Sequence, residues 1–245
     1  MRHFAALRAT CVEAWQDALD DVALPAWFVR LDAAARDLLI EACWRRERGE
    51  RPLPAEALEE VVLGLEEGVL SAQTASPEGA AFVRTGFRAP NDSAIAREND
   101  RQVDGGPEAL AVLLESRRVF EDLCLAQECA YEPSLVVRPW IEVAPSSELR
   151  AFVRERRLVG LSQRLTETPL PALGERAEDL EARVQRRCEE LRQRWPLPDL
   201  VVDFVVRDDE GALVLDLHPW LDWCDPALFS WQEDTFERYA FRTLS

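Results

Sequence analysis

Apolar residues recur at helical spacing through the first half of the chain. The segment from Phe4 to Leu19 carries one apolar stripe, which predicts a helix. A second helix is predicted from Leu31 to Trp44, with Asp32 as its N-cap. Proline is favoured in the first turn of a helix, so Pro54 and Pro107 mark the starts of two more. We therefore expect a largely helical first half.

Shorter runs rich in β-branched residues dominate the second half. Ser147 to Val153 and Leu158 to Arg164 are predicted to pair as a hairpin. Ser134 to Val143 is a strand in which Pro139 marks an end, a bulge or an edge. A charged, amphipathic helix is expected from Glu175 to Trp195. Helices followed by antiparallel strands indicate the α+β class.

A β-hairpin with a polar turn is the clearest element of the second half. A four-residue loop from Asp208 to Gly211 places Arg207 opposite Ala212. The same register places Asp203 directly opposite Asp216. Side chains alternate between the two faces of a strand, so the hairpin has one apolar face and one mixed face. The apolar face is expected to carry Val202, Phe204, Val206, Leu213, Leu215 and Leu217, and the mixed face Val201, Asp203, Val205, Val214, Asp216 and His218.

The two opposed aspartates are the strongest chemical signal in the sequence. Like charges opposite each other across a strand pair, with Cβ atoms about 5 Å apart, are destabilising. A cation would relieve the repulsion between Asp203 and Asp216. Two carboxylates suit Mg²⁺ that is bound together with a phosphate substrate, and we expect this arrangement. The alternative is that each aspartate meets an arginine.

Composition narrows the class of ligand. The formal net charge of −17 opposes nucleic acid as the main partner. A hydrophobic content of 47% supports a substantial core. The chain has no lysine, so all its fixed positive side chains are arginines. If it binds ATP, it must concentrate arginines locally and use Mg²⁺.

Several kinds of site are disfavoured by missing motifs. The six cysteines form no Cys-x-x-Cys pair and there are two histidines, which does not favour zinc. No Gly-x-Gly-x-x-Gly fingerprint, Walker A motif or Gly-x-Ser-x-Gly elbow occurs, so a Rossmann fold is not expected. The sequence has no signal-peptide pattern and no apolar run long enough to span a bilayer. We expect a cytoplasmic location and no membrane contact.

Five ordered blocks of sequence resemble the cell division cycle protein 123 family. They are Phe82–Asp92, Leu135–Trp140, Glu148–Val153, Leu161–Arg164 and Val202–Glu233. The order and spacing of the blocks also resemble the family. The resemblance implies an ATP-grasp fold with antiparallel sheets, in which two lobes clamp ATP. Residues 1–140 would form an N-terminal lobe with a helical part, a phosphate-side strand and the hinge, and residues 141–245 a C-terminal lobe with the cation-binding hairpin.

The resemblance also implies roles for the matched residues. Arg84 stands where the family has a phosphate-contacting lysine, and Arg150 and Arg164 stand on strands that line the phosphate end. The hinge, where backbone groups would meet the adenine, consists of Val137, Arg138, Pro139 and Trp140. The cation positions are Asp203, Asp216 and His218. For Arg138 and Arg150 the alternative is a structural ion pair with Glu142 or Glu148.

Three departures from the family pattern bear on these roles. Arg84 replaces lysine, so a broad fork replaces a compact ammonium group. His218 replaces asparagine, and imidazole suits Mn²⁺ or Zn²⁺ better than Mg²⁺. His218 could instead form a hydrogen bond with a carboxylate or a phosphate. The tripeptide Gly86-Phe87-Arg88 replaces Asn-Trp-Ser in the loop after the first strand.

Family members bind the γ subunit of eukaryotic initiation factor 2 and promote its assembly. The resemblance therefore implies a Mg·ATP-binding assembly factor, or chaperone, with a protein partner. One alternative is an ATP-grasp ligase that joins a carboxylate to an amine. Another is a nucleotide-free scaffold that has lost the site. The residues leave open whether the chain is an enzyme, and no catalytic residue is assigned.

Overall fold

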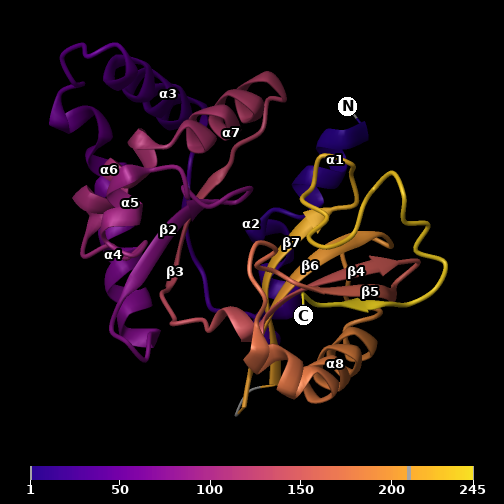
Figure 1. Ribbon diagram of the computed structural model, residues 1–245. Helices are drawn as coiled ribbons and strands as arrows, with labels where there is room; N and C mark the ends of the chain where they lie inside the picture. Colours follow the sequence, from indigo (N-terminus) through magenta and orange to yellow (C-terminus); the bar gives the residue numbers. More distant parts are fainter. Residues whose placement is uncertain (1, 209–210, 245) are drawn as a thin grey trace. The chain divides into compact units, whose positions relative to one another are not determined.

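The computed structural model describes residues 2–208 and 211–244, which form two compact units (Figure 1). Unit 1 comprises the described residues of 1–24 and 143–245, and unit 2 comprises Pro25–Glu142. The predicted boundary after residue 140 lies within two residues of the boundary at Glu142. The described residues of 1–24, which the sequence analysis placed with the N-terminal lobe, group with unit 1.

Unit 2 is a three-stranded antiparallel sheet with helices packed against it. The strand order is β1-β3-β2. Its elements are β1 (Trp27–Arg30), α3 (Ala33–Glu47), the 3-10 turn η2 (Ala55–Leu58), α4 (Glu59–Ala75), β2 (Ala81–Thr85), α5 (Ala94–Glu98), α6 (Gly106–Glu115), α7 (Arg117–Glu128) and β3 (Ser134–Pro139). Asp32 caps α3 as predicted, because its Oδ1 accepts a hydrogen bond from the Ala35 amide at 2.8 Å.

Pro139 ends the central strand of this sheet. Val137 pairs with Trp27 of β1 and with Val83 of β2, whereas Pro139 pairs with β2 only. The Trp140 amide donates to the Ala80 carbonyl on the β2 side, so the Pro139 nitrogen faces the other side, beyond the end of β1. The missing N–H therefore costs no ladder hydrogen bond. Of the three alternatives predicted at Pro139, an end, a bulge or an edge, the structure has the end of the strand.

Helix α4 approaches its neighbours closely at glycines. A Cβ atom on Gly68 would lie 2.9 Å from Cγ2 of Val137 in the central strand. A Cβ atom on Gly106, at the start of α6, would lie 2.4 Å from the Val62 carbonyl oxygen of α4. The Gly106 amide donates to the Glu66 carboxylate on the same helix. The packing of α4 against the sheet and against α6 thus depends on the absence of side chains.

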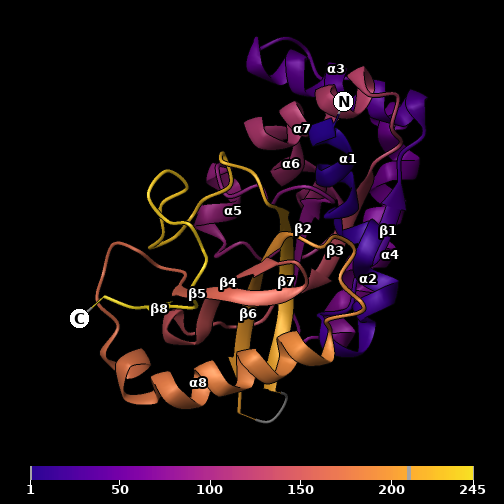
Figure 2. The ribbon, with the colours of Figure 1, turned by 90° about the vertical axis from the view of Figure 1, so that its right-hand side faces the viewer.

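Unit 1 is a five-stranded sheet with the order β7-β6-β4-β5-β8, and α8 lies along one of its faces (Figure 2). Its elements are α1 (Arg2–Ala9), α2 (Val12–Leu19), the 3-10 turns η1 (Asp20–Val22) and η3 (Pro145–Ser147), β4 (Glu148–Arg154), β5 (Arg157–Gln163), α8 (Pro171–Glu190), β6 (Leu200–Arg207), β7 (Gly211–Pro219) and β8 (Phe241–Arg242). The predicted β4–β5 hairpin is confirmed.

The N-terminal segment belongs to unit 1 because it covers the edge of this sheet. Both α1 and α2 contact β7, and Ala23 forms a parallel bridge with Val214. An uncovered edge strand exposes unpaired N–H and C=O groups, so this cover satisfies part of β7. The predicted single helix from Phe4 to Leu19 is divided at Thr10 and Cys11.

In the β6–β7 hairpin Asp203 pairs with Asp216, as predicted. Near the turn, however, the register of the two strands differs from the predicted one. Arg207 pairs with Gly211 and not with Ala212, and Asp209 and Glu210 of the predicted loop lie outside the described residues. A β-bulge at Leu215 then restores the predicted register.

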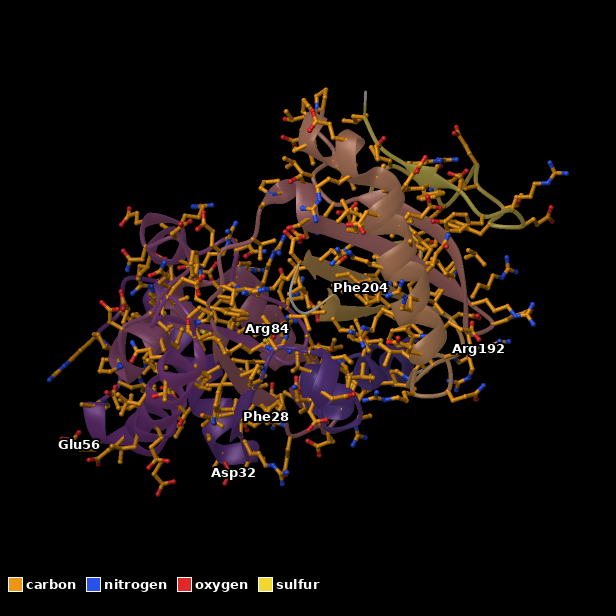
Figure 3. All side chains as sticks on the ribbon, turned by 90° about the horizontal axis from the view of Figure 1, so that it is seen from below. Phe28, Asp32, Glu56, Arg84, Arg192 and Phe204 are labelled. Atoms are coloured by element: carbon orange, nitrogen blue, oxygen red, sulfur yellow. The ribbon has the colours of Figure 1, made fainter. Side chains whose placement is uncertain are left out.

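The bulge exchanges the faces of two residues beyond it. Leu213 pairs with Val205 and Val214 pairs with Phe204. Directly paired residues point to the same face. The predicted faces of Leu213 and Val214 were therefore wrong, whereas Asp203, Asp216 and His218 share a face as predicted. Phe204, on the opposite face of β6, is labelled in Figure 3.

Gly106→Ala should lower the free energy of unfolding of unit 2 by about 1–3 kcal/mol, because the new methyl group would meet backbone atoms of α4. Urea denaturation measures the change. Gly174→Ala is the matched control, since a Cβ on this exposed residue of α8 meets nothing within 4 Å. The control should be neutral or stabilising by up to about 1 kcal/mol. Equal effects of the two substitutions would contradict the close α4–α6 approach.

Candidate functional site

A row of polar side chains crosses the sheet of unit 1 on one face. Arg150 of β4 pairs with Ser162 of β5 on one side and with Asp203 of β6 on the other. Asp203 in turn pairs with Asp216 of β7. Directly paired residues point to the same face, so four neighbouring strands contribute one residue each to the row. Ser162 is the member that was not predicted as a site residue.

Arg150 and Asp203 form a buried, bidentate ion pair. The Arg150 Nε donates to Oδ1 of Asp203 at 2.7 Å, and Nη2 donates to Oδ2 at 2.7 Å. The two residues are only 2% and 6% exposed. Burial alone would raise the pKa of Asp203, but Arg150, and then His218, hold this pKa well below its usual value. Burial alone would lower the pKa of Arg150, yet the facing Asp203 carboxylate raises it above its ordinary value.

This pair changes the interpretation of the opposed aspartates. The sequence analysis gave an arginine partner as the alternative to a metal, and for Asp203 the structure has that partner, Arg150. Charge repulsion across the hairpin therefore no longer requires a metal by itself. The alternative for Arg150, an ion pair with Glu142 or Glu148, is not the pair observed, because its carboxylate partner comes from the neighbouring strand β6.

His218 lies between the two aspartates. Its Nε2 is 2.9 Å from Oδ2 of Asp203 and 3.9 Å from Oδ2 of Asp216. The same nitrogen is 3.2 Å from Nη2 of Arg150. Nε2 can donate to Asp203 when it carries a proton, or accept from Arg150 when it does not. The imidazole therefore joins the carboxylate network, as the sequence analysis allowed.

The residues fit a cation that shares its ligands with a phosphate. Within the described residues, no group of three or more His, Cys, Asp or Glu side chains is arranged to hold a metal. Mg²⁺ commonly binds to one or two carboxylates together with substrate phosphates. The Asp203 and Asp216 side chains share a face and are 9% and 16% exposed. The assignment of Asp203, Asp216 and His218 as metal ligands stays a prediction.

Asp225 was missed by the sequence analysis and engages both arginines of the site. Arg164, just beyond β5, places Nη1 2.7 Å from Oδ2 of Asp225 and Nε 3.6 Å from Oδ2 of Asp203. Arg150 donates from Nη1 to the Asp225 backbone carbonyl at 2.5 Å. In the sequence, Asp225 precedes Pro226, and an Asp-Pro dipeptide is typical of a turn and gives no sign of this contact.

An aromatic cluster positions the segment that carries Asp225. Phe152 follows Arg150 on the same face of β4 and packs edge-on against Phe229 and Trp231, with ring centroids 4.9 and 5.8 Å apart. A Cβ on Gly160 of β5 would lie 3.0 Å from Phe229, so this ring rests directly on the strand. The cluster fastens the segment after β7 beside the polar row.

Arg84, which is labelled in Figure 3, belongs to unit 2. Its side chain holds a loop of that unit. Arg84 is only 4% exposed. Its Nε donates a hydrogen bond to the Thr85 carbonyl at 3.0 Å, and its Nη2 donates one to the Phe87 carbonyl at 3.1 Å. The guanidinium thus stabilises the Gly86-Phe87-Arg88 turn. The role of Arg84 as a phosphate ligand stays a prediction.

Arg88, one of the three residues at which this loop differs from the family pattern, has a structural role. Its Nε donates to Oδ1 of Asp122 on α7 at 2.8 Å, and Thr85 donates to Oδ2 of the same carboxylate at 2.6 Å. Burial raises the pKa of Asp122 above its ordinary value, against the opposing effect of Arg88. Arg88 therefore anchors the loop to α7.

The four residues predicted to form the hinge lie at the end of β3 and directly after it, in unit 2. Val137 is paired on both sides, and Arg138 is 1% exposed. The Trp140 amide donates to Ala80 at 2.9 Å, and its carbonyl accepts from Ser76 Oγ at 2.7 Å. These backbone groups already have partners within unit 2, and the adenine role of Val137, Arg138, Pro139 and Trp140 stays a prediction.

Comparison with known proteins identifies similar chains. The D123 family model matches residues 65–240. A "Translation initiation factor eIF2 assembly protein" of Botryotinia fuckeliana is 27% identical over 206 residues, which are 78% of this chain and 49% of the relative. "Cell division cycle protein 123" of Phaeosphaeria nodorum is 38% identical over 109 residues, 44% of this chain and 28% of the relative. These matches confirm the resemblance inferred from the five sequence blocks.

The fold has a counterpart among solved structures. The "Structure of Cdc123 from Schizosaccharomyces pombe" matches with a TM-score of 0.77 at 19% identity, covering 97% of this chain and 96% of that one. This match confirms the α+β class. The chain spans about half or less of the length of the two curated relatives it matches.

Arg150→Ala should destabilise unit 1 by about 3–5 kcal/mol, because it leaves the buried Asp203 carboxylate without its cation. Arg154→Ala, in an exposed position on the same strand, should cost less than about 1 kcal/mol. Denaturant unfolding compares the two. The double substitution Arg150→Met with Asp203→Leu should recover most of the loss. A small effect of Arg150→Ala would show that the pair is unimportant to the fold.

Stability should also depend on pH through Asp203. The pKa of Asp203 is lowered in the folded state, so its contribution is present above the unfolded pKa of about 3.9 and is lost as the pH falls through the folded pKa. The stability difference between wild type and Asp203→Asn should be largest above about pH 5 and shrink below about pH 4. Urea unfolding at pH 7, 5 and 3 measures it. A difference that does not change with pH would contradict the depressed pKa.

Proposed function

The chain belongs to the D123 family, and from this premise we propose that it binds ATP with a divalent cation in the ATP-grasp manner and acts as a protein assembly factor, or chaperone. The row formed by Arg150, Asp203 and Asp216, with His218 beside it, is the observation that carries the proposal. The row puts two carboxylates and the positively charged guanidinium of Arg150 on one face of the sheet.

The charges of the cluster favour a nucleotide that arrives with a metal ion. Two guanidinium groups, from Arg150 and Arg164, lie beside three carboxylates, from Asp203, Asp216 and Asp225. A triphosphate alone would add negative charge to a group that has no positive excess. Mg²⁺, or Mn²⁺ in view of His218, would neutralise charge between the carboxylates and the phosphates when bound.

The two arginines suit different tasks. The Arg164 side chain is 32% exposed, whereas that of Arg150 is 2% exposed. We assign Arg164 to direct contact with phosphate, since its fork can reach an incoming anion. Arg150 is assigned to hold Asp203 in orientation for the cation. Neither task forms a covalent intermediate, so the cluster can act by binding alone.

The assembly role is drawn from the relatives. The Botryotinia fuckeliana relative carries the name of an assembly protein for the translation initiation factor eIF2. We propose a translation-factor-like protein as partner of this chain, which places it in the cytoplasm. No helix of the described residues is long and apolar enough to cross a membrane. The net charge of −17 favours a protein over a nucleic acid as partner.

Titration calorimetry tests nucleotide binding. ATP should bind to the wild type in the presence of Mg²⁺ or Mn²⁺ and more weakly in EDTA. Asp216→Asn should weaken binding by roughly tenfold or more, because it removes a charged oxygen ligand. Asp222→Asn is the matched control: this residue is exposed in the segment after β7 and makes none of the hydrogen bonds or ion pairs described here.

Absence of heat with either cation would favour the nucleotide-free scaffold. An unchanged affinity of Asp216→Asn would remove the hairpin from the site. Release of ADP only when a carboxylate and an amine are both present would indicate a ligase instead of an assembly factor. Stoichiometric binding of a purified initiation-factor subunit without ADP release is the result expected here.

A further inference from the structure

One carboxylate beside the candidate site, that of Asp225, is not assigned to a cation or a nucleotide in the proposed function. Asp225 places Oδ2 2.7 Å from Nη1 of Arg164 and 3.6 Å from Nη1 of Arg150. Its backbone carbonyl accepts from Arg150. A single residue thus bears on both arginines, and its negative charge lies where a phosphate oxygen would be expected to bind.

The local backbone is built to present this carboxylate. Oδ1 of Asp225 accepts a hydrogen bond from the Ala227 amide at 2.9 Å, which closes a tight turn. Ala227 has φ +51°, a left-handed conformation that costs energy for a residue with a Cβ atom. The next amide, of Leu228, donates to Oγ of Ser162 at 3.2 Å, and Ser162 belongs to the polar row.

The ion pair between Asp225 and Arg164 is accessible to solvent. The two side chains are 52% and 32% exposed, in contrast to the 2% and 9% of the Arg150–Asp203 pair. Exposed pairs of this kind are weak and easily exchanged. A phosphate group brings more charge and more acceptor oxygens than a carboxylate, so it can replace Asp225 on the guanidinium.

We propose that Asp225 is an affinity-setting residue whose carboxylate occupies Arg164 in the place of a phosphate and is displaced when a phosphate binds. This inference rests on the proposed nucleotide site. It adds that the chain itself supplies a competing anion, so that its affinity for polyphosphate is lower than its arginines alone would give.

The test is the substitution Asp225→Asn. Asparagine keeps the Oδ1 acceptor for Ala227 and the backbone carbonyl for Arg150. It removes the charge and replaces Oδ2, which accepts from Arg164, with an uncharged NH2 donor. Calorimetry with Mg·ATP and, separately, with inorganic tripolyphosphate should give binding that is roughly three- to tenfold tighter than in the wild type. Asp222→Asn removes the same charge from the same segment and should leave both affinities within about twofold.

A double-substitution cycle shows whether the gain passes through Arg164. In an Arg164→Gln background, Asp225→Asn should no longer tighten tripolyphosphate binding, because the guanidinium that it frees is absent. Thermal unfolding without ligand should be nearly the same for wild type and Asp225→Asn. That result separates a change in affinity from a change in folding.

The outcomes separate this inference from the proposed function. If Mg·ATP binds to the wild type and Asp225→Asn binds equally or more weakly, the inference is overturned and the nucleotide site stands. If Mg·ATP binds to neither variant but tripolyphosphate binds more tightly to Asp225→Asn, the inference stands and the nucleotide proposal fails. If neither ligand binds to any variant, both are overturned. An equal gain in Asp222→Asn would reduce the effect to net charge and would also overturn the role of Asp225.

Discussion

The buried ion pair between Arg150 and Asp203 is the interaction on which the rest of the site depends. Both residues are nearly inaccessible, and removal of either partner would leave an uncompensated charge in the interior. The pair fixes the orientation of the Asp203 carboxylate. That carboxylate in turn holds His218 beside Asp216. Because the pair uses Nε and Nη2 of Arg150, Nη1 is left to donate to the Asp225 carbonyl. In the proposed function, this structural ion pair would therefore also form part of the binding site.

This arrangement changes the way in which a cation can act. The like charges of Asp203 and Asp216 are already relieved in part by the protein. In the proposed function, a divalent ion would be needed for the ligand and not for the fold, since the cluster has no positive excess to offer a triphosphate. Such a site would bind metal and nucleotide together, which agrees with the small number of carboxylates it contains.

Much of unit 1 follows from local patterns in the sequence. Alternation and turn residues predicted both hairpins and the pairing of Asp203 with Asp216. The bulge at Leu215 was not predictable, because it depends on how the turn closes and not on the strand pattern. The face of Val214 was therefore assigned wrongly.

Contacts between distant segments could not be predicted. The Arg150–Asp203 pair requires β4 to lie beside β6, although 53 positions separate the two residues. Asp225 reaches Arg164 only because an aromatic cluster fastens its segment to β4. Residues 1–24 join unit 1 because an edge strand needs cover, which the helical pattern alone does not reveal. Family resemblance proposed candidate site residues that the alternation could not, such as Arg164.

The most direct test of the central claim is a crystal structure with Mn²⁺ and a non-hydrolysable ATP analogue, in which anomalous scattering locates the metal. The account predicts one Mn²⁺ peak within coordination distance of oxygens of Asp203 and Asp216, phosphate oxygens on the same ion, and Arg150 still paired with Asp203. A nucleotide bound elsewhere, or no metal peak at the two aspartates while Arg150 and His218 keep their present contacts, would contradict it.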